Sequence, residues 1–181
     1  MSARLFAALE LPAAVRARLS AFGRSAAAHD HALRAVDEDT LHVTLAFLGD
    51  RAEDDVEPAR AAIRGVAGSP APSLALGPAM WLPTRSPHVL TIGVEEGEGV
   101  LAALHADVGR RLSEVLAWEP DGRRFRPHVT VARVQRTGRP RTRGLDEAPS
   151  ARFAAEAVVL YRSHLGDGPA RYEALERAEL A

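Results

Sequence analysis

The sequence predicts an α+β fold whose strands pair mainly in antiparallel hairpins. Segments with the apolar character of strands are interspersed with segments that have the 3.6-residue apolar period of helices. Short turns rich in proline or glycine, at 83–87 and 165–170, favour hairpins between neighbouring strands. A short pattern, His-Val-Thr followed by an apolar residue and an alanine, occurs twice and indicates a duplicated half.

The first third of the chain is expected to contain three strands and two helices. Residues 3–9 are apolar and form a strand. Pro12 begins a helix, because its fixed φ suits the first helical turn, and Val15, Leu19 and Phe22 line one face. The expected elements after it are the helix end near 23–29, a strand at 32–36, a polar turn at 37–41, the first His-Val-Thr strand, closed by Gly49 and Asp50, and a helix at about 53–67.

The remainder is expected to add a second set of strands around one more helix. Residues 68–72 are small or proline, and they are the expected exchange point between two lobes of a single domain, 1–181. The expected elements beyond them are strands at 73–82 and 88–94, the longest helix at about 98–117, the second His-Val-Thr strand, an irregular stretch at 135–150, and strands at 152–161 and 170–176.

Both copies of the repeated pattern have the alternation of a half-buried strand. The first is His42-Val43-Thr44-Leu45-Ala46, and the second, 86 residues later, is His128-Val129-Thr130-Val131-Ala132. Residues two apart on a strand point to the same face, so each copy presents an imidazole and a hydroxyl side by side. The valine and the apolar residue between and after them point into a core. One such pattern is commonly a solvated strand, but two in one small domain indicate a shared function.

These motifs resemble the 2H phosphoesterase superfamily, and within it the bacterial RNA 2',3'-cyclic phosphodiesterases, also called 2'-5' RNA ligases. The opening segment 4–12, the block 126–133 and the ending 160–175 are each similar to the corresponding segment of that family. The resemblance implies two pseudo-symmetric lobes, each a small antiparallel sheet with outer helices, facing each other across a central cleft. Each lobe would contribute one His-Val-Thr strand to the floor of the cleft.

The resemblance also implies an activity, namely the opening of RNA 2',3'-cyclic phosphate ends to 2'-phosphates, with reverse 2'-5' RNA ligation. This in-line displacement needs a base for the entering oxygen and an acid for the leaving oxygen, and histidine suits both near neutral pH. The sequence leaves open which histidine has which role. We expect His42 to be the proton donor and His128 the proton acceptor, with Thr44 and Thr130 as phosphate ligands. No metal and no cofactor are expected.

Four further residues are candidates for substrate contact. On a strand that stays regular, we expect Arg133 to share the face of His128 and Thr130 and to hold phosphate with its forked guanidinium. Three others are expected to border the cleft: Arg126 two residues before His128, Phe125 as a stacking partner for a base, and His164 in the last hairpin.

Composition and charge exclude several classes of protein. The chain is 46% apolar and 26% charged, without the long apolar run of a membrane helix, and it contains no cysteine. We therefore expect a cytoplasmic monomer with no membrane association. Its net charge is −1, yet eight arginines and no acid lie between Asp121 and Asp146. A basic stretch of this kind suits an anionic partner such as an RNA end, for example a tRNA half, or it is a solvated loop of an arginine-rich chain.

Three alternative functions stay open at this point. A metal-dependent hydrolase would usually carry an acidic residue beside histidine on the same face, and here that neighbour is threonine in both copies. A non-catalytic binder of nucleotide or RNA is a second alternative, which the intact pair of histidines disfavours. The third is the same chemistry on a small cyclic nucleotide or an ADP-ribose cyclic phosphate.

Overall fold

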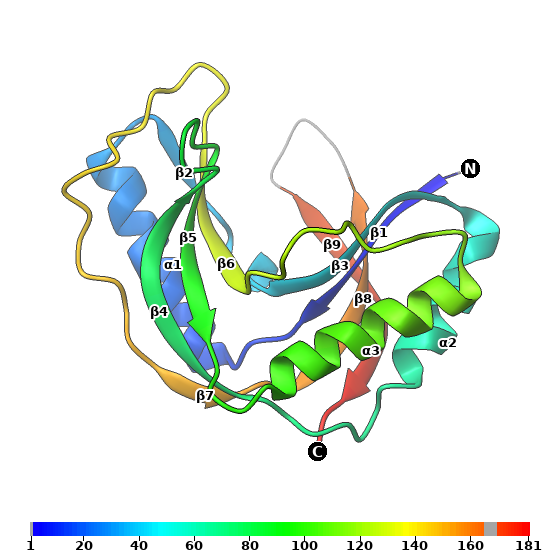
Figure 1. The fold of residues 1–181 in the computed structure, drawn as a ribbon. Helices are drawn as coiled ribbons and strands as arrows, with labels where there is room; N and C mark the ends of the chain where they lie inside the picture. Colours follow the sequence, from blue (N-terminus) through cyan, green and yellow to red (C-terminus); the bar gives the residue numbers. More distant parts are fainter. Residues whose placement is uncertain (1, 165–169) are drawn as a thin grey trace.

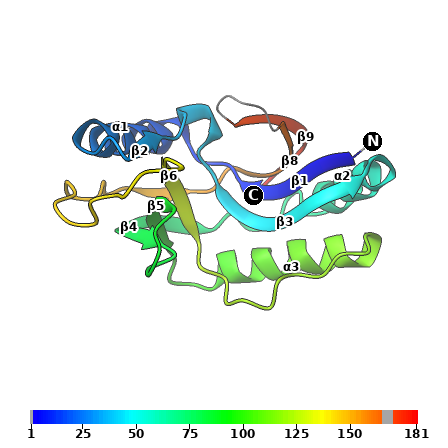
Figure 2. The ribbon, with the colours of Figure 1, turned by 90° about the horizontal axis from the view of Figure 1, so that it is seen from above.

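The computed structural model describes residues 2–164 and 170–181 and shows a strongly curled sheet with helices packed outside it (Figures 1 and 2). The predicted turn at 165–170 lies, except for Ala170, outside the described residues. The helices are α1 (Ala13–His29), α2 (Val56–Arg64) and α3 (Val100–Val115), with short 3₁₀ turns at Glu38–Thr40 and Glu53–Asp55. The strands are β1 (Ser2–Leu9), β2 (Leu33–Ala35), β3 (Val43–Ala52), β4 (Ser73–Leu82), β5 (Val89–Glu95), β6 (His128–Val134), β7 (Arg152–Ala154), β8 (Ala157–His164) and β9 (Arg171–Glu179).

The strands form one sheet of two halves that meet at the repeated pattern. The order is β7-β4-β5-β6-β3-β1-β8-β9, with β2 on the other side of part of β6, and every pairing is antiparallel. We call β1, β3, β8 and β9 the β1 half, and β2, β4, β5, β6 and β7 the β5 half. The halves join through a single register pair, Val43 with Val129, which are the middle residues of the two copies. The predicted α+β class and antiparallel pairing are confirmed.

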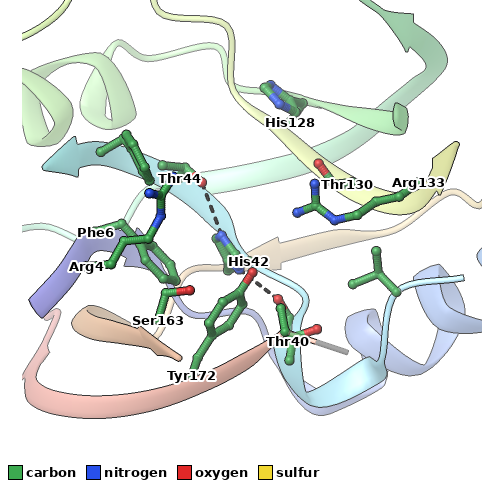
Figure 3. Close-up of a pocket in the computed structure, with 13 residues that line it drawn as sticks. Arg4, Phe6, Thr40, His42, Thr44, His128, Thr130, Arg133, Ser163 and Tyr172 are labelled. Carbon is green, nitrogen blue, oxygen red and sulfur yellow. Dashed lines mark hydrogen bonds between the residues drawn. The ribbon is translucent and has the colours of Figure 1, made fainter. Parts of the chain in front are cut away.

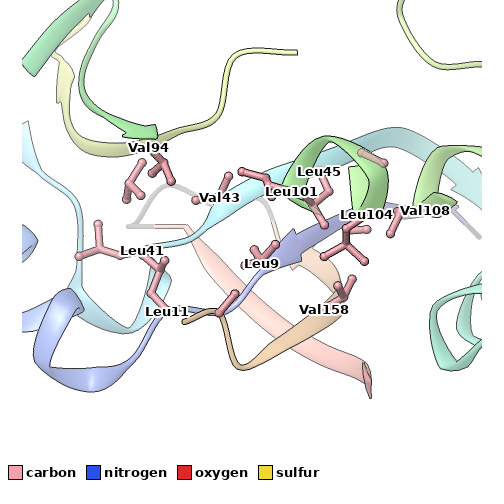
Figure 4. Packing of buried hydrophobic residues seen from close by; sticks show 14 of the residues in the cluster. Leu9, Leu11, Leu41, Val43, Leu45, Val94, Leu101, Leu104, Val108 and Val158 are labelled. Atoms are coloured by element: carbon pink, nitrogen blue, oxygen red, sulfur yellow. The ribbon is translucent and has the colours of Figure 1, made fainter. Parts of the chain in front are cut away.

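The helices pack on the face of the sheet opposite to the one that presents His42 and His128. Helix α1 packs against β2 and β6 of the β5 half, whereas α2 and α3 pack against each other and against strands of the β1 half (Figure 1). Val43 and Leu45 of β3 are buried and lie with Leu101 and Leu104 of α3 in the core (Figure 4). Burial of these apolar side chains, each worth about 1.5–3 kcal/mol when complete, fixes the face that β3 turns outward.

Several element boundaries differ from the sequence-based expectations. Strand β3 continues through Gly49 to Ala52, because Gly49 adopts φ of 70° in a bulge and lets the strand bend rather than end. The expected strand at 152–161 is two strands, β7 on β4 and β8 on β1. Helix α1, at 17 residues, is longer than α3, at 16, and α2 occupies only the middle of 53–67.

Candidate active site

A cavity of about 390 Å³ lies at the joint between the two halves, and we call it the catalytic pocket. It collects both histidines and both threonines of the repeated pattern, and Arg133 as well (Figure 3). The remaining lining residues come mainly from the β1 half and the segment before β3: Arg4, Phe6, Val36, Thr40, Phe47, Ser163, Ala170 and Tyr172.

The two histidines are held by the same hydrogen bond in both copies. The Nδ1–H of His42 donates to the carbonyl of Thr40 at 2.7 Å, and the Nδ1–H of His128 donates to the carbonyl of Arg126 at 2.6 Å. A carbonyl oxygen only accepts, so in each neutral ring the proton is on Nδ1 and the lone pair is on Nε2. Each half of the sheet therefore offers one Nε2 as a proton acceptor, oriented by the backbone two residues upstream.

The threonines lie beside the histidines, as the alternation of a strand requires. The hydroxyl of Thr44 donates to Nε2 of His42 across 3.1 Å (Figure 3). Thr130 lines the same pocket, and its hydroxyl makes no hydrogen bond within the part of the chain that the structure describes. One hydroxyl is therefore engaged with an imidazole and the other is free for a ligand.

A bulge in β6 decides where Arg133 points. The register with β5 skips Val131, so Val131 and Ala132 are both buried and Arg133 emerges beside Thr130. In a regular strand, residues three apart point to opposite faces, so Arg133 would point away from Thr130. The sequence analysis expected a regular strand to bring Arg133 to the face of His128 and Thr130, and that reasoning is wrong. Arg133 reaches the catalytic pocket because the strand is irregular.

The first copy has the same bulge at the same place. The register of β3 with β1 skips Leu45, so Leu45 and Ala46 are both buried and Phe47 emerges on the pocket side. Phe47 follows His42 by five residues, as Arg133 follows His128. The two halves thus share the histidine, the threonine and the bulge. They differ five residues after the histidine, where β3 presents the aromatic ring of Phe47 and β6 the guanidinium of Arg133.

Helix α1 is packed directly against the bulge in β6. A Cβ atom at Gly23 would lie well inside 3.0 Å of the carbonyl oxygen of Val131. That oxygen also accepts the backbone N–H of Val36 at 2.9 Å. Only glycine allows the helix this approach, so Gly23 supports the geometry that directs Arg133 into the pocket.

The opposite wall is a row of side chains across three strands, which the sequence reasoning did not identify as site residues. Arg4 of β1 pairs with Ser163 of β8, and Ser163 pairs with Tyr172 of β9. The guanidinium of Arg4 lies 5.0 Å from the centroid of the Phe47 ring and 3.5 Å from Asp50. The available signal was the alternation of Arg4 with Phe6 on an otherwise apolar strand.

His42 is neutral in the free protein at pH 7. Its ring lies 4.9 Å from that of Phe6 and 5.6 Å from that of Tyr172, measured between centroids, so water reaches it poorly. Burial lowers the pKa of His42 to about 4, the hydrogen bond to Thr40 opposes this shift, and the positive charge of Arg133 adds to it, as does that of His128 whenever its ring is protonated. An imidazole in this state is a weak base, and it can serve as a proton donor only after a bound negative charge has raised its pKa.

Three of the sequence-based candidates lie outside the catalytic pocket. Phe125 stacks on His105, with 3.8 Å between ring centroids, and so is occupied by packing. The side chain of Arg126 lines separate surface hollows near β4, because Pro127 lies between it and the strand; only its carbonyl serves the site. His164 is exposed, and its Nε2 lies 2.9 Å from a carboxylate oxygen of Glu173.

Two further observations concern the described residues. No group of three or more His, Cys, Asp or Glu side chains among them is arranged to hold a metal ion. Across residues 2–164 and 170–181, no helix combines the length and the apolar character needed to cross a membrane.

The chain is similar to named proteins over most of its length. A family model described as the 2'-5' RNA ligase superfamily matches residues 8–167. A protein of Geobacillus stearothermophilus named RNA 2',3'-cyclic phosphodiesterase is 33% identical over 175 residues, which are 94% of this chain and 55% of that protein. One of the same name from Archaeoglobus fulgidus is 30% identical, over 74% of this chain and 73% of its own. The chain spans little more than half the length of the first of these relatives.

Solved structures give the same result for the fold. The crystal structure of E. coli LigT complexed with 3'-AMP superimposes with a TM-score of 0.81 at 25% identity, covering 99% of both chains. That of TT0787 of Thermus thermophilus gives a TM-score of 0.78 at 28% identity, covering 97% of both. The fold is thus shared with known proteins over nearly the whole chain.

Proposed function

The chain belongs to the 2'-5' RNA ligase superfamily, and from this premise we propose that it opens 2',3'-cyclic phosphate ends of RNA to 2'-phosphomonoesters without a metal ion. The names of its curated relatives, RNA 2',3'-cyclic phosphodiesterase, support this class of reaction. The observation that carries the proposal is the pair of imidazoles, one from each half of the sheet, whose Nδ1–H groups make identical hydrogen bonds to the backbone and so leave the lone pair of each ring on Nε2, in the catalytic pocket.

The proposed displacement uses one histidine on each side of phosphorus. His128 accepts a proton from water as the water oxygen bonds to phosphorus. The bond from phosphorus to the 3'-oxygen breaks, and His42 donates a proton to that oxygen, leaving the phosphate on the 2'-oxygen. Thr44, Thr130 and Arg133 would hold the non-bridging oxygens, where negative charge grows in the transition state.

The acid role of His42 requires that substrate binding raise its pKa. A phosphate monoanion in the catalytic pocket opposes the charge of Arg133, which lowers the pKa of His42 in the free protein. Protonation also changes the hydrogen bond with Thr44, since Nε2–H then donates and the threonine oxygen accepts. The hydroxyl proton of Thr44 becomes free to bind phosphate, so the acid and the phosphate ligand would be prepared together.

Phe47 offers the nucleoside a surface in the catalytic pocket. Phe47 is 53% exposed although it is large and apolar, and Arg4 lies against its ring. The N–H of the Trp118 indole donates to the carbonyl of Phe47 at 3.2 Å and supports this part of β3. A base stacked on Phe47 would exclude water from it, at a gain of about 1–3 kcal/mol.

Ligation follows from the same displacement. If the 5'-hydroxyl of a second RNA end replaces water, the product is a 2'-5' bond, and the reverse reaction cleaves it. RNA halves, such as those of tRNA, are substrates of the right chemistry. A small cyclic nucleotide is the second candidate substrate, because the cavity of about 390 Å³ has the size of a site for a single nucleotide.

A product assay tests the proposal. The protein, with EDTA present, is incubated with an oligoribonucleotide that ends in a 2',3'-cyclic phosphate, and the terminal phosphate is identified. We expect a 2'-phosphate from the wild type, none from His42→Ala or His128→Ala, and full activity from His31→Ala, an exposed histidine outside the pocket. If the protein turned over small cyclic nucleotides but not RNA, the proposed substrate would have to be changed to a small cyclic nucleotide. Binding without any turnover would reject the enzymatic reading.

A further inference from the structure

Two arginines face each other beside the catalytic pocket. Arg34 of β2 is the direct register partner of Arg133 of β6. None of the ion pairs found among residues 2–164 and 170–181 includes either of them, within a nitrogen–oxygen limit of 4.0 Å. Like charges directly opposite on adjacent strands destabilise a sheet. A bound anion between the two guanidiniums would remove this cost.

The side chain of Arg34 is directed by the burial of its neighbour. Leu33 is buried against α1, and alternation along β2 places Arg34 on the opposite, exposed face. Arg133 reaches the same face through the bulge in β6. The pair therefore depends on both the short strand β2 and the irregularity of β6, and the sequence pattern alone does not bring the two residues together.

A second cavity of about 250 Å³ lies at this arginine pair, and we call it the outer pocket. It adjoins the catalytic pocket, because Arg133, Thr40 and Tyr172 line both. Residues that belong to the outer pocket alone include Arg34 and Asp37. The hollows near Arg126, by contrast, share no lining residue with the catalytic pocket.

We propose that the outer pocket binds the phosphodiester that precedes the terminal nucleotide of the substrate, and that Arg34 is its main ligand. This inference rests on the proposed function and names its substrate class as an RNA end rather than a mononucleotide. When the cyclic phosphate occupies the catalytic pocket, the next negative charge along the RNA is the phosphodiester on the 5' side of the same nucleotide. A planar guanidinium binds two of its oxygens at once, which a point charge does not do.

Asp37 lines the same outer pocket, and its carboxylate would distinguish an RNA segment from a free anion. It repels phosphate, but it accepts a hydrogen bond from a ribose hydroxyl, and a chain of ribonucleotides offers both groups together. Asp37 lies beyond 4.0 Å from both guanidiniums, so it leaves their charge available.

Equilibrium binding of reaction products tests the outer pocket without requiring turnover. The ligands are adenosine 2'-phosphate, the diadenosine dinucleotide with a terminal 2'-phosphate, and the same dinucleotide with a neutral methylphosphonate linkage. We expect the wild type to bind the charged dinucleotide about tenfold more tightly than the neutral one, as for a hydrogen bond to a charged group. Arg34→Gln should lose most of this ratio and Arg34→Lys part of it. Arg85→Gln, in the exposed turn after β4, should keep it.

The outcomes separate this inference from the proposed function. Equal affinity of the wild type for the charged and neutral dinucleotides would overturn it. So would a loss in Arg34→Gln that is the same for the mononucleotide and the dinucleotide. If the wild type failed to open the cyclic phosphate but still preferred the charged dinucleotide to the neutral one, the proposed catalysis would be rejected. The proposal that the outer pocket binds a phosphodiester would then still hold.

Discussion

Gly23 lies within α1 against the bulge in β6, and replacing it by alanine tests whether this contact fixes the bulge. A methyl group there would overlap the carbonyl oxygen of Val131, which is backbone and cannot rotate away. Overpacking of this kind costs about 1–3 kcal/mol. Alanine is favoured over glycine within a helix by about 1 kcal/mol. We therefore expect Gly23→Ala to be less stable than the wild type by up to about 2 kcal/mol.

Gly109 of α3 is a matched control for the helix propensity. It is also a buried glycine within a helix, but a Cβ atom there would meet only Pro120, at an ordinary 3.6 Å. Gly109→Ala should therefore gain up to about 1 kcal/mol. Urea unfolding of both variants gives the difference between them, expected at the overpacking cost of about 1–3 kcal/mol with similar m-values. If Gly23→Ala gained stability as Gly109→Ala does, α1 would not be locked against the bulge.

The same substitution has an expected consequence for the site. Displacement of the Val131 carbonyl shifts Ala132 and so reorients Arg133, which the bulge directs into the catalytic pocket. A displacement of about 1 Å in a positioning group costs on the order of 100-fold in rate. We expect the activity of Gly23→Ala on a cyclic phosphate to fall while Gly109→Ala stays at the wild-type value. Unchanged activity in Gly23→Ala would show that Arg133 is positioned independently of the helix.

Three further predictions concern the pocket. His42 has a lower pKa in the folded than in the unfolded protein, so the unfolded chain takes up the proton first as pH falls, and stability should drop between about pH 6.5 and pH 4 by at most about 3 kcal/mol. Denaturation against pH should show a flatter slope for His42→Gln; an identical slope would contradict this. Thr44→Val and Thr130→Val should each lower kcat by about 10²–10³ if they stabilise the transition state, and a change in KM alone would assign them to ground-state binding. Phe47→Ala should weaken nucleotide binding by about 1–3 kcal/mol but leave inorganic phosphate binding intact; calorimetry that shows equal losses would exclude stacking.

The sequence by itself determined the parts of the site that depend on local period. The His-Val-Thr alternation places each histidine beside its threonine and buries Val43 and Val129, because side chains of a strand alternate between faces wherever one face is buried. The repetition of the pattern also predicted that the two copies act together, and the structure joins them at their middle valines.

Tertiary structure decided everything that depends on register between strands. The bulges that bring Arg133 and Phe47 into the catalytic pocket are extra residues relative to a neighbouring strand, so no period within one strand reveals them. Phe125 had the composition of a stacking residue, but its ring is packed on His105, a contact between distant parts of the chain. The sequence did not identify Arg34 as a site residue, because its proposed role depends on Arg133, which lies opposite it only in the folded sheet. Which side chains share a strand face follows from local geometry, whereas which strands lie side by side follows from burial of the whole core.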